Sequence, residues 1–218
     1  MRVQITIIVL MLAGPLASAQ DVRIGVFGLF HPRQLIVSPP AGAAIIVHTG
    51  HQSFAIENGS GANGVSIQSL GNELIVRCGT HSVESPELTV SIRENGPVDF
   101  LLSVPGKITR HYRGRLEIKQ AFGILIPIVS MDIETAVASV VAAEGMPGAP
   151  MEALKAQAVA GRSYFTDGKG RHNDFDFCDT THCQFLREPP GPESAAFKAT
   201  IATRGFVIAY QSRVFAAM

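Results

Sequence analysis

The first half of the chain contains short runs of apolar and β-branched residues, and the first of these runs alternates with polar positions, as half-buried strands do. Clusters of Gly, Asn, Pro and Ser separate the runs and are typical of turns. We therefore expect residues 20–106 to form a β-rich N-terminal region. The runs that predict strands are residues 22–27, 44–47, 65–67, 74–76, 88–92 and 115–118.

After Pro127 the apolar residues follow a helical period. Residues 132–143 carry Ile133, Val137, Val140 and Val141 on one stripe, which predicts an amphipathic helix. Ser130 is a candidate cap for its start, with acidic residues in the first turn. Gly145 and Pro147 end it.

Two more helices are expected further along. Pro150 stands where a first helical residue belongs, and the Ala-rich residues 151–165 follow it. Residues 192–203 predict a third helix that ends at Gly205, and residues 206–210 predict a last strand. The fold class is thus α+β: a β-rich N-terminal half followed by a mixed helical and strand domain over residues 107–218.

The N-terminus has the features of a secretory signal peptide. Arg2 precedes an apolar run over residues 3–12, and Ala17-Ser18-Ala19 forms a cleavage site. An N-terminal membrane anchor is the alternative, but the run is short for a span of about 20 residues. We expect residues 1–19 to be cleaved and the mature protein to be secreted or periplasmic.

Charge and composition exclude several classes of protein. Lys plus Arg and Asp plus Glu both number 18, and this zero net charge argues against nucleic acid as a partner. The 46% hydrophobic and 17% charged fractions exclude a disordered chain. There is no Trp, so a carbohydrate site built on tryptophan platforms is impossible.

Glu144 is the first candidate for chemistry. It lies at the C-terminal end of the helix over 132–143, where the helix dipole disfavours a negative charge. Burial against Val140, Val141 and Met146 would add to that effect, and a carboxyl group that keeps its proton can act as a general acid. The alternative is a solvated glutamate at a helix end.

The next helix carries polar residues in rows. Lys155, Arg162 and Ser163 lie near one face, and Gln157 and Tyr164 are also seven residues apart. Such a helix can approach another element closely while presenting hydrogen-bond donors. It can equally be an ordinary packing helix with solvated polar ends.

The chain contains three cysteines, of which two belong to the pattern His172-x5-Cys178-x3-His182-Cys183. Cysteine and histidine at such spacings can ligate zinc. A Cys178–Cys183 disulfide or two unrelated thiols are the alternatives. Cys78 stands apart in a strand pattern and is expected to be a buried thiol.

Taken in order, several of these segments resemble the SpoIID/LytB family, named for a sporulation stage II protein and an amidase enhancer. The resemblance rests on residues 112–118, 140–147, 152–164, 178–184 and 202–205. It implies a peptidoglycan lytic transglycosylase, which cuts the β-1,4 bond between N-acetylmuramic acid and N-acetylglucosamine in strands stripped of stem peptides and leaves 1,6-anhydro ends. The family's catalytic acid corresponds to Glu144 and its substrate-holding helix arginine to Arg162. A zinc ion found in some members would correspond to His172, Cys178 and Cys183.

One carboxylate is enough for this reaction, because the 6-hydroxyl of the sugar replaces the water that other glycosidases activate. Glu144 would act as acid and then as base, with no cofactor required. Arg162, Lys155, Gln157 and Tyr164 would bind substrate. The expected partners are glycan strands and a cell-wall amidase.

Two other functions stay open at this point. One is a non-catalytic wall-binding protein that enhances an amidase, and the other is a zinc-dependent hydrolase. The family's further C-terminal strand and Gly-Gly segment have no counterpart before Met218, so we expect a C-terminally truncated domain.

Overall fold

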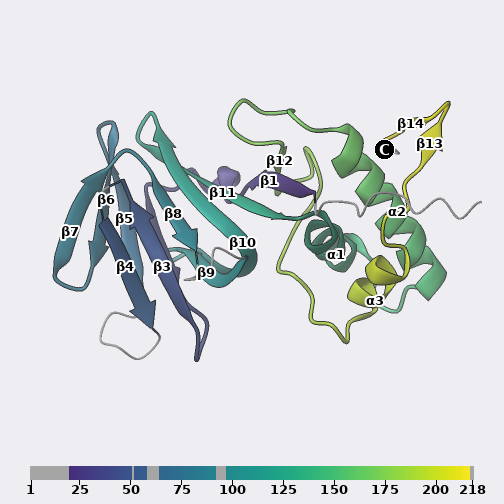
Figure 1. The fold of residues 1–218 in the computed structure, drawn as a ribbon, viewed down its shortest axis with the longest axis horizontal. Coiled ribbons are helices and arrows are strands. Elements are labelled where there is room, and N and C mark those ends of the chain that lie inside the picture. The colour runs from purple at the N-terminus through teal and green to yellow at the C-terminus, as the bar shows by residue number, and fades with distance from the viewer. Residues whose placement is uncertain (1–19, 51, 58–63, 92–96, 217–218) are drawn as a thin grey trace, which may run out of the picture.

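The computed structural model describes residues 20–50, 52–57, 64–91 and 97–216. The predicted signal peptide, residues 1–19, lies outside them. Most strands occupy one end of the molecule and three helices the other, with the first strand running between the two and the β13–β14 hairpin at the helical end (Figure 1). The expected α+β class is confirmed.

One long strand, β10 (Ile108–Ala121), belongs to two sheets at once. Its first half pairs with β9 and its second half with β11 and β8. At the change of partners, a Cβ on Gly114 would lie 2.3 Å from the carbonyl oxygen of Ser130, so only glycine fits there.

The strands divide between the sheets on either side of β10. Beyond β9 (Val98–Val104), one sheet continues through β2 (Gln34–Ser38), β5 (Val65–Leu70), β6 (Glu73–Cys78) and β7 (His81–Ser85). The other contains β8 (Leu88–Ser91), β3 (Ala44–Thr49) and β4 (Gln52–Glu57) and, across β10, β11 (Ile124–Asp132), β1 (Asp21–Gly25) and β12 (Phe177–Cys178). β1 therefore lies between β11, its antiparallel partner, and β12, its parallel partner.

Alternation of buried and partly exposed residues builds the core of the sheets. In β9, Val98, Phe100, Leu102 and Val104 point inward and the residues between them do not. The buried apolar residues form one cluster that continues into the helices. The domain boundary expected between residues 106 and 107 falls in the turn that joins β9 to β10. These two strands pair with each other along their whole contact, from Val104 opposite Ile108 to Val98 opposite Gly114.

The first helix, α1 (Ile133–Glu144), starts later than Ser130. Asp132 is its N-cap, and its carboxylate accepts the backbone N–H groups of Glu134 at 3.0 Å and Thr135 at 3.4 Å. The expectation that Ser130 caps this helix is wrong, because Ser130 lies in β11 opposite Arg23 and Arg115.

The other two helices begin close to where the sequence placed them. Pro150 is the N-cap of α2 (Met151–Asp167) rather than its first residue. The third helix, α3 (Ala195–Ala202), is shorter than expected, because Ser194 caps it by accepting the N–H of Phe197 at 3.1 Å. The many alanines of α1, α2 and α3 let all three helices pack against one another.

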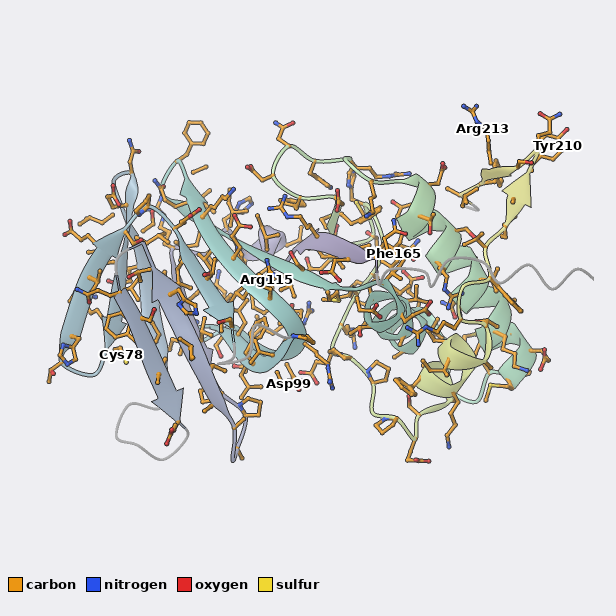
Figure 2. All side chains as sticks on the ribbon, viewed as in Figure 1. Cys78, Asp99, Arg115, Phe165, Tyr210 and Arg213 are labelled. Atoms are coloured by element: carbon orange, nitrogen blue, oxygen red, sulfur yellow. The ribbon has the colours of Figure 1, made fainter. Side chains whose placement is uncertain are left out.

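The last predicted strand is shorter than residues 206–210. Only β13 (Ala209–Tyr210) is extended, and it pairs with β14 (Arg213–Val214). Tyr210 and Arg213 project from this hairpin at the opposite end of the molecule from Cys78 (Figure 2). Among the described residues, no helix is long and apolar enough to cross a membrane.

Candidate active site

Glu144 is the last residue of α1, and its side chain is exposed. Its Oε1 atom accepts the backbone N–H of Phe185 at 2.9 Å. The expected burial of Glu144 is wrong, because the carboxylate turns outward toward Phe185 and Met146 is 77% exposed. The helix ends tightly at Gly145, where a Cβ would come within 2.5 Å of the carbonyl oxygen of Val141.

The segment that supplies Phe185, residues 177–185, is tied to the sheets by Asp179. This carboxylate is 5% exposed, and its Oδ2 accepts the N–H of Phe27 at 3.2 Å and Nη1 of Arg110 at 3.0 Å. Burial raises the pKa of Asp179, and the bonds from Phe27 and Arg110 offset only part of that rise. The backbone N–H of Asp179 also donates to the carbonyl of Gly25.

Three residues of this segment and His172, which precedes it, form a cluster of four metal-ligating side chains: His172, Cys178, His182 and Cys183. Their donor atoms all lie within 4.8 Å of one another. Nε2 of His172 is 3.3 Å from Sγ of Cys183, and Nδ1 of His182 is 3.5 Å and 3.7 Å from the sulfurs of Cys183 and Cys178.

These distances fit a tetrahedral zinc ion, for which two cysteines and two histidines are a usual ligand set. All three cysteines are free thiols in the structure. The ligands predicted from the sequence were His172, Cys178 and Cys183. His182 was not among them, although it belongs to the same sequence pattern.

The cluster is partly shielded from water. Burial raises the pKa of the Cys183 thiol, and burial together with the nearby His182 lowers the pKa of His172. A neutral imidazole is the form that binds a metal. The hydroxyl of Tyr164 contacts Cys183, and burial raises the pKa of Tyr164 as well.

Arg162 is enclosed among the three helices and is 2% exposed. Its Nε and Nη2 atoms donate to the two carboxylate oxygens of Glu134 at 2.9 and 2.6 Å. Its remaining donors reach the carbonyl oxygens of Ala158, Thr200 and Phe206. All five N–H donors of the guanidinium group thus have protein acceptors, so Arg162 braces the helices and does not face a ligand. Its partner Glu134, in the first turn of α1, is 28 positions away along the chain, so no local pattern links the two residues.

The other three predicted substrate-binding residues differ in how deeply they are buried. Tyr164 is buried, with its ring 5.5 Å from that of Phe177. Lys155 reaches the surface and pairs with Glu152 at 2.7 Å. Gln157 is half-buried, and its Oε1 lies beside Gly145, the residue that follows Glu144.

The comparison with known families bears on this arrangement. Residues 123–210 match the family model described as Stage II sporulation protein, SpoIID. This part of the chain is a SpoIID-family domain. The SpoIID match contains Glu144, Arg162 and the Cys/His cluster, and it indicates a role related to sporulation or the cell wall. Phe27 and Arg110, which hold Asp179, lie outside it. A comparison with curated proteins found no match to the chain.

Proposed function

We propose that this protein is a peptidoglycan lytic transglycosylase in which Glu144 is the general acid and base. Its substrate is the β-1,4 bond between N-acetylmuramic acid and N-acetylglucosamine in glycan strands without stem peptides. The protein works outside the cytoplasmic membrane after cleavage of residues 1–19. A cell-wall amidase is a second partner that acts on the same polymer.

The observation that carries this proposal is the exposed carboxylate of Glu144, oriented by the amide of Phe185 inside the SpoIID-matched segment. Asp179, the carboxylate of residues 177–185, is buried and paired with Arg110. It is therefore not free to activate water. A single oriented carboxylate can serve a reaction in which the substrate supplies its own nucleophile.

The reaction needs two proton transfers. Glu144 in its acid form donates a proton to the glycosidic oxygen as the bond between that oxygen and C1 of N-acetylmuramic acid breaks. The 6-hydroxyl oxygen of the same sugar then bonds to C1, and its proton passes to the Glu144 carboxylate. The acid form is restored, no water is consumed, and the product carries a 1,6-anhydro ring.

The residues around Glu144 have two kinds of role in this proposal. Lys155 and Gln157 reach the surface of α2, and they bind sugar hydroxyl and acetamido groups. Arg162 and Tyr164 are buried, so they act by positioning: Arg162 holds the three helices together, and Tyr164 supports Cys183.

Zinc has a structural role in the proposal. His172, Cys178, His182 and Cys183 would hold it, and four protein ligands leave no open position for catalytic water. The bound ion would cross-link the ends of the segment that leads to Phe185. The chemistry itself requires no cofactor.

The test is mass spectrometry of denuded glycan strands incubated with the mature protein. We expect 1,6-anhydro ends from the native protein and a loss of at least about 100-fold in Glu144→Gln, because general acid catalysis contributes about 10²- to 10⁴-fold. Glu193→Gln is the matched control, since Glu193 is exposed and pairs with Lys198. Binding without cleavage by the native protein would contradict the proposal and favour a non-catalytic amidase enhancer.

A further inference from the structure

A cavity of about 170 Å³ lies beside residues 177–185. Three distant parts of the chain form its wall. Residues 177–185 contribute Asp179, Thr180, Thr181 and Phe185, the turn after β1 contributes Phe27, Leu29 and Phe30, and strand β10 contributes Arg110. The cavity adjoins the proposed catalytic acid, because Phe185 is part of this wall and its amide donates to Glu144.

The wall combines aromatic rings with fixed polar groups. Phe27 and Phe30 meet edge to face with ring centroids 5.8 Å apart. The guanidinium group of Arg110 lies 5.6 Å from the Phe27 ring and is held there by Asp179. A sugar ring has an apolar C–H face and a polar edge, so it matches such a wall, and the volume suits one ring rather than an oligosaccharide.

The backbone of the turn that carries Phe30 is held in an unusual conformation. Phe27 and His31, on either side of the short 3-10 helix η1 (Gly28–Phe30), have φ angles of 60° and 44°. Left-handed conformations are unfavourable in residues other than glycine and concentrate at functional sites. The bond from the N–H of Phe27 to Asp179 fixes one end of this turn. Leu29 in its middle is 77% exposed.

We propose that this cavity is a subsite that binds one sugar residue of the glycan, next to the bond that Glu144 cleaves. The proposal rests on the proposed function and extends it to residues outside the SpoIID match. The turn after β1 and strand β10 then have a role in substrate binding. Phenylalanines supply the aromatic surface that tryptophans cannot supply in this chain.

The experiment measures the affinity of undecorated glycan oligosaccharides by calorimetry. All variants carry Glu144→Gln, so that the ligand is not consumed. Phe30→Ala should weaken binding about tenfold, the scale of one lost aromatic contact. Leu29→Ala should weaken it by a smaller factor, and it keeps the test decisive if Phe30→Ala unfolds, because Leu29 is mostly exposed.

Phe122→Ala is the matched control, since Phe122 is fully exposed in the turn between β10 and β11. It should leave affinity unchanged. In the catalytically active protein, Phe30→Ala should raise KM more than it lowers kcat.

Two outcomes would overturn the subsite, and they are distinguishable. If the Glu144→Gln protein binds glycan and neither Phe30→Ala nor Leu29→Ala weakens binding, the subsite is wrong and the proposed function stands. If the native protein neither binds nor cleaves glycan, both are wrong.

Discussion

The strand end and the helical end of this molecule are stabilised in different ways. In the sheets, apolar residues such as Leu35 and Phe100 are completely buried, and alternation sends polar residues outward. Around the helices, several buried side chains are polar or charged, and each makes specific hydrogen bonds or ion pairs. The buried polar residues are Thr49 and Ser85 in the strand end, and Glu134, Ser139, Arg162, Ser163, Asp179, Thr200 and Thr203 in the helical end and its segment.

This difference bears on the candidate site. Hydrophobic burial is not directional, so it stabilises the sheets without setting the position of any one functional atom. Hydrogen bonds and ion pairs have defined geometry and are costly to leave half-made when buried. The buried polar residues of the helical end therefore tolerate fewer substitutions than the apolar residues of the sheets. The same bonds fix the helices and, with them, the position of Glu144.

The largest expected effect comes from breaking the brace between the helices. Arg162→Met leaves Glu134 buried without its partner and should lower the free energy of unfolding by about 3–5 kcal/mol. Arg115→Met is the control, because Arg115 is exposed on β10 (labelled in Figure 2) and should change stability by less than about 0.5 kcal/mol. Urea denaturation of both proteins measures the difference.

The double variant Arg162→Met with Glu134→Leu sharpens this test. Replacing a buried ion pair by apolar residues of similar volume is often neutral or stabilising, so most of the loss should be recovered. A cost below about 1 kcal/mol for Arg162→Met alone would mean that the brace does not hold the helices.

A smaller effect is expected from removing the proposed zinc ion. The purified protein should contain about one zinc ion per chain. Chelation should lower Tm by about 2–4 °C for each kcal/mol by which it lowers the free energy of unfolding. Chelation should also speed hydrogen exchange at the Phe185 amide, which donates to Glu144.

Two cysteine variants separate the cluster from a general effect of thiols. Cys183→Ser should reduce zinc content, whereas Cys78→Ser should not, because Cys78 lies in β6 at the far end of the sheets (Figure 2). Protein without zinc and with a Cys178–Cys183 disulfide would refute the metal site.

The smallest expected effect concerns an ion pair where the strand end meets β1. Partial burial disfavours ionisation of Glu117, but hydrogen bonds and charges from Lys119 and Arg23 outweigh it and hold the pKa of Glu117 below 4.5. A lowered pKa stabilises the fold above the unfolded value of 4.5, and this contribution is lost as the pH falls through the folded value.

Glu117→Gln should therefore cost less than about 1 kcal/mol at pH 7. The difference from the native protein should shrink as the pH falls below 4.5. Thermal unfolding at several pH values measures this. A difference that persists at low pH would show that packing, and not charge, explains the effect.

The features that were predictable from the sequence are local ones. Strands β3, β5, β6 and β8 coincide with apolar runs, and the three helices with periodic segments. Strand β4 was missed because it is mostly exposed and has little apolar signal, and β9 was missed although its burial alternates throughout.

In the candidate site, too, the predictable features are local, and contacts between distant residues were not predictable. The Cys/His cluster comes from a span of twelve residues, so its pattern was visible. Arg110 and Asp179 are 69 positions apart and Phe27 and Asp179 are 152 positions apart, and no local pattern predicts such contacts. The burial of Arg162 was not predictable either, because its acceptors come from α1, α3 and the segment after α3.

The central claim is that Glu144 acts alone and the sugar supplies the nucleophile. The most direct test is to digest denuded glycan strands in water enriched in ¹⁸O and to weigh the new ends by mass spectrometry. We predict 1,6-anhydro ends that contain no ¹⁸O, because water does not take part in the reaction. Reducing ends that carry one ¹⁸O atom would show hydrolysis and contradict the account.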